Sequence, residues 1–238
     1  AVFHAEDETD MTFLGIIAFL DPPKPDAKEA IHGLYDAGVQ VKVISGDAPV
    51  VVEHVCKLVG MKVGEQNAVT GSDLEKMSEE ELSSVVEKKD IFARLSPMQK
   101  QRVVDALRKN GHVVGYMGDG VNDAPSLHDA DVGISVDNAT DVAKASADII
   151  LLEKSLTVIL NGIYEGRRIY GNILKYMKMA LSGNFGNVFS VLIASIFLPF
   201  LPILPLQILI QNLIYDFTQI AIPWDNVDEE FLQKPHKW

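Results

Sequence analysis

Hydrophobic and polar positions follow two different patterns along this chain of 238 residues. Residues 1–178 mix charged side chains with short apolar runs, whereas residues 179–223 contain almost no charge. Apolar runs that alternate with amphipathic helical patterns predict a parallel sheet with helical crossovers. An uncharged stretch of about 20 residues is long enough to cross a bilayer as a helix. The chain is therefore expected to combine an α/β domain with a membrane part.

The first part of the chain, residues 1–153, contains the apolar runs expected for the strands of the α/β domain. The first run, MTFLGIIAFL at 11–20, is interpreted as a central strand that ends at Pro22-Pro23, although a short buried helix has the same periodicity. Further strands are expected at 39–44, 67–70, 91–94, 113–117, 131–136 and 148–152.

Helices are expected between these strands, and two of them begin at a typical capping residue. Asp26 is the expected side-chain cap of the first helix, and Ser96-Pro97 is the expected start of a later one. Gly38 and Gly60 are expected to end the first two helices. The predicted helices cover 26–37, 48–59, 78–86, 97–110 and 138–147.

The membrane part is predicted as two spans that follow a stalk helix. Residues 154–178 form the stalk and residues 179–198 the first span. Three prolines mark an outer loop at 199–205, and a second span at 206–223 returns the chain to a cytoplasmic segment at 224–238. Positive charge before the first span places this end, and with it the α/β domain, in the cytoplasm. The basic stripe of the stalk helix consists of Arg167, Arg168, Lys175 and Lys178.

Composition narrows the classes of function. The net charge of −12 argues against a nucleic-acid partner. The single cysteine, Cys56, excludes an internal disulfide framework, and the histidines show no zinc-type spacing. These features leave a protein of a reducing compartment whose chemistry depends on carboxylates, amides and hydroxyls.

The densest chemistry follows the apolar run at 113–117, in the sequence GDGVNDAP. Asp119 and Asp123 lie four residues apart across a strand-to-helix turn. Both carboxylates can reach one point at the carboxyl end of the strand, where open α/β sheets place ligands. Two carboxylates and the Asn122 amide suit Mg²⁺, which takes few protein ligands. A solvated Asp-Gly turn is the alternative for an isolated pair, but the full motif after a strand favours a metal site.

Two further positions have the chemistry of a phosphate site. Ser45 ends a predicted strand beside Gly46 and Asp47, where a hydroxyl and exposed backbone N–H groups suit phosphate, although a helix cap has the same sequence. Lys100 lies in the first turn of a helix, where a cation opposes the helix dipole. A solvated surface lysine is the alternative to a functional role for Lys100.

Both predicted spans carry polar residues that hydrocarbon does not tolerate without partners. An ionisable residue such as Asp216 inside a span is by default a candidate functional residue. If the two helices face each other, the polar residues form an oxygen-rich cage for a hard cation. The alternative is hydrogen bonding between the helices, and Gly183 and Gly186 permit close packing there. The residues of the proposed cage are Asn184, Asn187, Asn212 and Asp216.

Four motifs resemble those of the P-type ATPases, within the haloacid-dehalogenase-like superfamily. GDGVNDAPSL at 118–127 resembles the phosphorylation-domain signature, and DPPK at 21–24 the hinge beside the nucleotide domain. SGD at 45–47 is similar to the family's TGD, and FARLSPMQK at 92–100 is similar at every key position. The resemblance implies an α/β fold, a partial haloacid-dehalogenase-like Rossmann-type parallel sheet, followed by an α-helical transmembrane hairpin.

The resemblance also implies roles for individual residues. Asp119 and Asp123 would hold a catalytic Mg²⁺, and Lys100 would neutralise charge on a phosphorylated aspartate. Asp21 and Lys24 would lie beside ATP, although Lys24 lacks the bidentate fork of the arginine that is commoner there. Asn187, Asn212 and Asp216 match ion-site positions. The implied catalytic residues are Asp119, Asp123, Asn122, Lys100, Ser45, Gly46 and Asp47.

The whole chain resembles the second part of the phosphorylation domain, the stalk and the fifth and sixth membrane helices, and looks most like the bacterial magnesium-transporting branch. This implies ATP-driven transport of Mg²⁺ across the inner membrane into the cytoplasm, as a multi-pass protein in the lipid bilayer. The partners would be the nucleotide domain, the actuator domain and the remaining membrane helices. The acceptor aspartate of DKTGT does not occur here, so we expect a fragment that is inactive alone. A calcium or proton pump, a soluble phosphatase and a non-catalytic membrane regulator are the alternatives.

Overall fold

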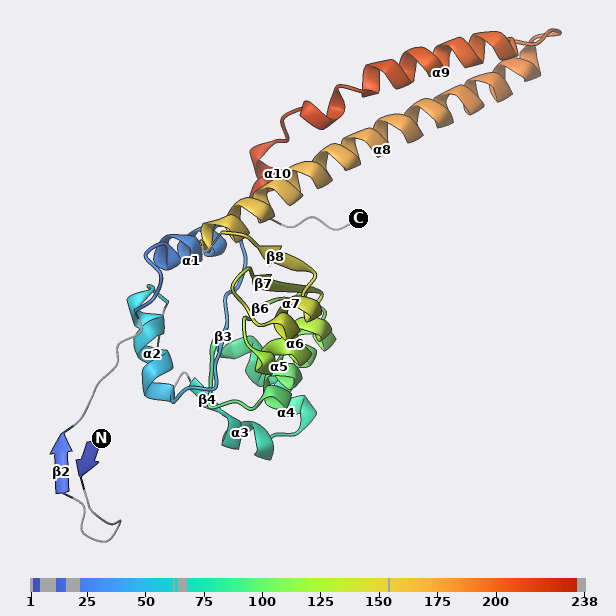
Figure 1. Ribbon diagram of the computed structural model, residues 1–238. Helices are drawn as coiled ribbons and strands as arrows, with labels where there is room; N and C mark the ends of the chain where they lie inside the picture. The colour runs from blue at the N-terminus through green and yellow to red at the C-terminus, as the bar shows by residue number, and fades with distance from the viewer. Residues whose placement is uncertain are drawn as a thin grey trace.

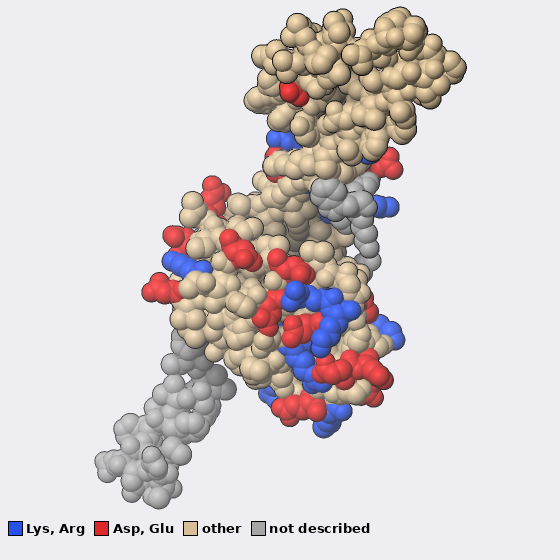
Figure 2. All heavy atoms as spheres, turned by 90° about the vertical axis from the view of Figure 1, so that its right-hand side faces the viewer, with Lys and Arg blue, Asp and Glu red and all other residues tan. Residues whose placement is uncertain are grey.

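The computed structural model describes residues 22–61, 63, 68–153 and 155–234, together with the backbone of Val2–His4 and Thr12–Gly15. An α/β domain forms the lower part of the molecule, and two long helices project from it side by side (Figure 1). Charged side chains gather on the α/β domain, whereas the projecting helices carry few (Figure 2). The two hydropathy patterns of the sequence therefore correspond to two structural parts.

Two three-stranded parallel sheets form the α/β domain. In the first, β3 (Val43–Ile44) and β4 (Ala68–Thr70) flank β5 (Ile91–Ala93), and Val43 pairs with Ile91. In the second, the order is β6 (Gly115–Met117), β7 (Val132–Val136) and β8 (Ile149–Leu151). The parallel pairing confirms the sequence-based prediction. Among the described strands, however, no ladder joins β3 to β6, so the predicted single sheet is divided.

The interpretation of residues 11–20 as a central strand of the parallel sheet is wrong for the part that the structure describes. β2 (Thr12–Gly15) pairs antiparallel with β1 (Val2–His4) and belongs to neither parallel sheet. An apolar, β-branched run indicates a strand but does not specify its partner or its direction. The rest of that run lies outside the described residues.

Three helices of the α/β domain begin at a capping box. Thr70, Ser78 and Ser96 each form a capping box with the residue three positions later. The short helix α3 was not predicted, although the Thr70–Asp73 pair carries its signal. The helices are α1 (Ala27–Asp36), α2 (Pro49–Leu58), α3 (Gly71–Lys76), α4 (Glu79–Lys88), α5 (Pro97–Lys109), α6 (Ala124–Asp129) and α7 (Asp141–Ser146), with a 3₁₀ turn η1 at Val121–Asp123.

Helix α5 joins the two sheets through its buried face. Its residue Val103 packs in a cluster around Phe92 of β5, and the adjacent Val104 packs in a second cluster with Tyr116 of β6. The side chains of Phe92, Val103 and Val104 are all fully buried. The first turn of α5 is therefore held at a fixed position relative to the carboxyl end of β6. This places Lys100 near the loop that follows β6.

A single helix, α8 (Thr157–Phe197), contains both the predicted stalk and the predicted first span. Among the described residues it is the one helix long and apolar enough to cross a membrane. The second predicted span is matched only by α9 (Pro205–Gln219), whose 15 residues rise about 22 Å. This rise is less than the hydrocarbon thickness of about 30 Å. The chain then bends through the 3₁₀ turn η2 (Ile222–Trp224).

The segment after α9 folds back onto the lower half of α8. Lys175 Nζ lies 2.8 Å from Asp225 Oδ2, and Arg167 donates to the carbonyl of Leu232 in α10 (Glu229–Gln233). A Cβ on Gly171 would lie 2.7 Å from Val227 Cγ1, so the backbone of α8 closely approaches this segment. Two of the basic residues that indicated membrane topology therefore also bind the returning chain.

The predicted side-chain cap by Asp26 is wrong. Asp26 precedes α1, but its carboxylate makes no capping bond to that helix. It instead accepts hydrogen bonds from Ser155 Oγ at 2.7 Å and from the backbone N–H of Leu156 at 2.6 Å, immediately before α8. A carboxylate is stabilised at a helix N-terminus by the helix dipole. Asp26 therefore caps α8 from a distant part of the chain and not its own helix.

The hydrogen bond from Ser155, together with backbone N–H groups, holds the pKa of Asp26 below its ordinary value. A lowered pKa stabilises the fold above the pKa of the unfolded chain, about 3.9, and this contribution is lost as the pH falls through the folded-state pKa. We expect Asp26→Ala to lower the melting temperature at pH 7, and we expect this effect to shrink as the pH falls below the unfolded-state pKa. Glu29→Ala, the same charge change on the exposed face of α1, is the control. Equal effects of the two substitutions at pH 7 would contradict this role of Asp26.

Candidate functional site

The loop after β6 is fixed by hydrogen bonds to the neighbouring strand and helix. Gly118 N–H donates to the Ile134 carbonyl at 3.1 Å, and the fully buried Ser135 hydroxyl donates to the Gly118 carbonyl at 2.9 Å. The Asp119 carbonyl accepts from Thr140 N–H at 3.0 Å. The Asp119 side chain remains exposed. A rigid loop therefore presents this carboxylate at the carboxyl edge of β6, as the sequence predicted.

Asp123 lies at the centre of a hydrogen-bond network. Its Oδ1 is 2.8 Å from Lys100 Nζ and accepts the Tyr116 hydroxyl at 2.9 Å. Its Oδ2 accepts Gly120 N–H at 3.2 Å. The Lys100 and Asp123 side chains are only 12% and 13% exposed, so their attraction is weakly screened. The structure thus brings together two predicted residues that are 23 positions apart in the chain.

Electrostatics keep Asp123 ionised. Burial alone would raise its pKa, but the donors Lys100 and Tyr116 together outweigh burial and hold the pKa below the ordinary carboxyl value. The same burial, with the Asp123 charge beside it, raises the pKa of Tyr116, which therefore stays a neutral donor. Asp123 is consequently available as an anion at neutral pH.

Gly118 is required by the close approach of Asp123. A Cβ on Gly118 would lie 2.5 Å from Asp123 Cβ and 2.8 Å from Asp123 Cγ. Real Cβ atoms do not approach other carbons so closely, because the overlap is strongly repulsive. The glycine before Asp119 thus lets both carboxylates of the motif share one turn. Asn122, between them, is exposed and belongs to η1.

The predicted phosphate loop at 45–47 follows β3 on the first sheet. Ser45 Oγ donates to Asp47 Oδ2 at 2.9 Å and accepts Asp47 N–H at 3.1 Å. The loop is tied to the end of β5, because Arg94 N–H donates to the Asp47 carbonyl at 2.9 Å. Arg94 has a positive φ of 53°, which is uncommon for a residue other than glycine. Ser45 and Gly46 are therefore held near the carboxyl edge of their sheet.

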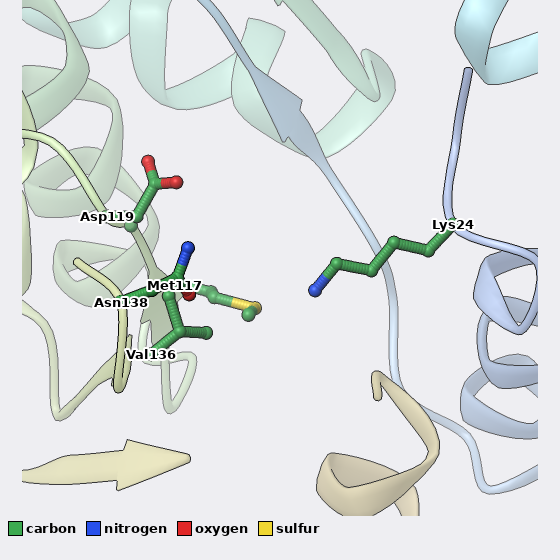
Figure 3. Close-up of a pocket in the computed structure, with 6 residues that line it drawn as sticks. Lys24, Met117, Asp119, Val136 and Asn138 are labelled. Carbon is green, nitrogen blue, oxygen red and sulfur yellow. The ribbon is translucent and has the colours of Figure 1, made fainter. Parts of the chain in front are cut away.

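A cavity of about 220 Å³ lies between the Lys24 segment and the second sheet. Figure 3 shows the Lys24 side chain extending from one side of the cavity toward Met117 and Asn138, and Asp119 lies on the same side as these two residues. Asp21, the other residue predicted beside ATP, lies outside the described residues. The lining residues are Lys24, Met117, Gly118, Asp119, Val136 and Asn138.

Sequence reasoning missed Asn138, Thr140 and Tyr116 as parts of this site. Asn138 and Thr140 follow β7, so their position after a predicted parallel strand carried the available signal. Tyr116 lies inside an apolar run, where an aromatic residue indicates only packing. Its hydroxyl contact with Asp123 could not be inferred from the run alone.

The polar residues of the long helices are only partly brought together. Gln211 donates to Asn187 Oδ1 at 2.9 Å across the contact between α8 and α9. Asn184, Asn212 and Asp216 are exposed, and no bond among them occurs in the described part of the chain. The helices thus make the interhelical hydrogen bond that was one of the two predicted alternatives. The other three residues remain available to bind a partner.

Comparison with known proteins identifies the family to which this chain belongs. Residues 2–131 match the family model of haloacid dehalogenase-like hydrolases, and the chain belongs to this family. It is 58% identical over 98% of its length to "Magnesium-transporting ATPase, P-type 1" of Salmonella typhimurium, of which it covers 25%. A "Calcium-transporting ATPase" of Bacillus subtilis is 39% identical over 95% of the chain, which covers 26% of that protein. The chain thus spans about a quarter of these relatives.

A solved structure of a catalytic domain of a CPx-ATPase is 28% identical, with a TM-score of 0.44. That match covers 58% of this chain and 44% of the other.

Proposed function

We propose that this chain forms part of an ATP-driven P-type pump that carries Mg²⁺ into the cytoplasm and hydrolyses ATP through an aspartyl-phosphate. The observation that carries the proposal is the Lys100–Asp123 ion pair, at 2.8 Å, beside the exposed Asp119 at the end of β6. This arrangement places a nearly buried cation against one of the two carboxylates that would hold a metal ion. The identity of 58% with a magnesium-transporting ATPase supports the same assignment.

Asp119 and Asp123 fit a catalytic Mg²⁺. Asp119 offers an exposed carboxylate, and Asp123 Oδ2 has Gly120 N–H as its one hydrogen-bond donor in the described structure. Mg²⁺ binds through one or two carboxylates and otherwise keeps water or phosphate oxygens. When bound, the ion would neutralise phosphate charge. Lys100, anchored by Asp123, would neutralise charge on the acceptor, as an immobile cation does in phosphoryl transfer.

The acceptor aspartate is proposed to lie on a strand between β3 and β6, supplied by a part of the protein outside this chain. Each of these strands pairs with one described neighbour, so each has a free edge. The Ser45 loop ends β3, and the Asp119 loop ends β6. An aspartate at the end of an intervening parallel strand would therefore have a phosphate-binding hydroxyl on one side and the metal site on the other. Lys24 would reach the nucleotide from the adjoining cavity.

The α8–α9 pair is proposed to be a transmembrane hairpin in the inner membrane, with the α/β domain in the cytoplasm. Large apolar side chains of both helices are exposed, including Leu192, Ile193, Leu209 and Phe217. An exposed apolar surface of this kind indicates contact with lipid or other membrane helices. Asn184, Asn212 and Asp216 would bind the transported cation together with groups from other helices.

Transport by the intact protein in proteoliposomes tests this function. We expect ATP-dependent movement of Mg²⁺, followed with an enclosed magnesium indicator, and loss of transport in Asp216→Asn. Ca²⁺ or proton movement without Mg²⁺ movement would assign the pump to another cation. ATP hydrolysis with no ion movement would contradict the transport proposal.

A further inference from the structure

Tyr215 of α9 contacts α8 at a glycine. Its hydroxyl donates to the carbonyl of Met179 at 2.8 Å. A Cβ on Gly183 would lie 2.9 Å from Tyr215 Cζ and 3.0 Å from the hydroxyl oxygen. The tyrosine ring therefore occupies the space that a side chain at Gly183 would fill. We call the three residues Met179, Gly183 and Tyr215 the tyrosine clasp.

The clasp sets the register of the two helices. Met179 and Gly183 are four residues apart and so lie on one face of α8, while Gln211 and Tyr215 share the same spacing on α9. The Gln211–Asn187 bond continues the contact one turn further along α8. Two directional hydrogen bonds and one close packing contact thus fix how far α9 is displaced along α8. A slip of one residue would shift α9 along α8 by about 1.5 Å.

The three exposed polar residues each follow a residue of this contact by one position. Asn184 follows Gly183, Asn212 follows Gln211, and Asp216 follows Tyr215. One residue turns an α-helix by about 100°. For two antiparallel helices viewed from one end, this turn is clockwise on one and anticlockwise on the other. It therefore brings all three side chains to the same flank of the pair, where each is exposed.

The axial levels on this flank also match. Gln211 meets Asn187 and Tyr215 meets Gly183, so each step forward along α9 corresponds to one step backward along α8. Asn184 consequently lies at a level between Asn212 and Asp216, within about two helical rises of either. The clasp thus determines the spacing of three oxygen-bearing groups that do not bond to one another.

We propose that Tyr215 and Gly183 are positioning residues that set the geometry of a divalent-cation site on this flank. The inference rests on the proposed function, since the site is that of the transported ion. Tyr215 binds no cation in this account. It acts by holding Asn184 at an axial level between those of Asn212 and Asp216.

Matched glycine substitutions in the intact pump test the proposal. Gly183→Ala inserts a methyl group into the tyrosine ring, whereas Gly186→Ala, nearly one turn away on α8, meets nothing within 4 Å. We expect Gly183→Ala to raise the Mg²⁺ concentration for half-maximal transport by about tenfold, because misplacement of about 1 Å is costly at a preorganised site. Gly186→Ala should leave this concentration unchanged. Tyr215→Phe keeps the ring and removes one hydrogen bond, so about a threefold rise is expected.

A cross-linking measurement reads the register without reference to transport. Cysteines placed at Asn187 and Gln211, whose native side chains bridge the two helices, should be joined readily in the membrane by a short bifunctional thiol reagent, since they lie too far apart for a direct disulfide. Adding Gly183→Ala should slow this reaction severalfold, and adding Gly186→Ala should not. If the intact protein moves no cation, the proposed function fails while cross-linking still tests the clasp. Equal cross-linking and equal Mg²⁺ dependence in the two glycine variants would overturn the proposal. If Gly183→Ala does not fold, an unchanged Mg²⁺ dependence in Tyr215→Phe would overturn it.

Discussion

Lys100→Met is expected to slow phosphorylation from ATP severely and to destabilise the α/β domain. The substitution leaves the nearly buried Asp123 carboxylate without its 2.8 Å cation, and breaking a buried pair costs about 3 kcal/mol. Loss of a fixed charge at a phosphoryl-transfer site lowers the rate by about 10²- to 10³-fold. Thermal unfolding and initial rates of phosphoenzyme formation measure the two effects separately.

The double variant Lys100→Met with Asp123→Asn separates structure from catalysis. It removes both charges, so most of the lost stability should return while phosphorylation is not restored. Lys109→Met is the control on the same helix, because its side chain is 70% exposed and its ion pair with Glu79, at 3.7 Å, is weak. Normal phosphorylation in Lys100→Met would contradict the role given to this lysine.

Gly118→Ala is expected to reduce phosphorylation as severely as loss of a ligand. The added Cβ would lie 2.5 Å from Asp123 Cβ, so the turn must open and the two carboxylates must separate. The matched control is Gly115→Ala in the strand β6 that precedes this loop, where the nearest atom to the new Cβ, the Val132 carbonyl oxygen, is 3.9 Å away. The Mg²⁺ dependence of phosphoenzyme formation in both variants is the measurement. Equal behaviour of Gly115→Ala and Gly118→Ala would show that the close approach is unimportant.

Local chemistry explains why most of the α/β domain could be predicted from the sequence. Ser78 and Ser96 cap helices through bonds to residues three positions away, and Gly38 and Gly60 adopt positive φ where helices were expected to end. Lys100 was singled out because a cation opposes the dipole at a helix start. Its partner Asp123 confirms that another interaction holds it there.

Partner choice over long distances could not be predicted in this way. Asp26 has the sequence of a local cap, yet its carboxylate binds Leu156, 130 positions away. Tyr215 sits in an apolar stretch that indicated only a membrane span, and its contact with Gly183 depends on how two helices align. The prediction of a central parallel strand at 11–20 was wrong for the same reason. An apolar run can pair with any strand that offers a free edge, and β2 pairs with β1.

Formation of an acid-stable phosphoenzyme by the intact protein is the direct test of ATP hydrolysis through an aspartyl-phosphate. Incubation with γ-labelled ATP and Mg²⁺, followed by acid quenching, should label the protein in a form that hydroxylamine releases, as expected for an aspartyl-phosphate. Chelation of Mg²⁺ or Asp123→Asn should remove the label. A correctly folded intact protein that hydrolyses ATP but never carries label would contradict the account.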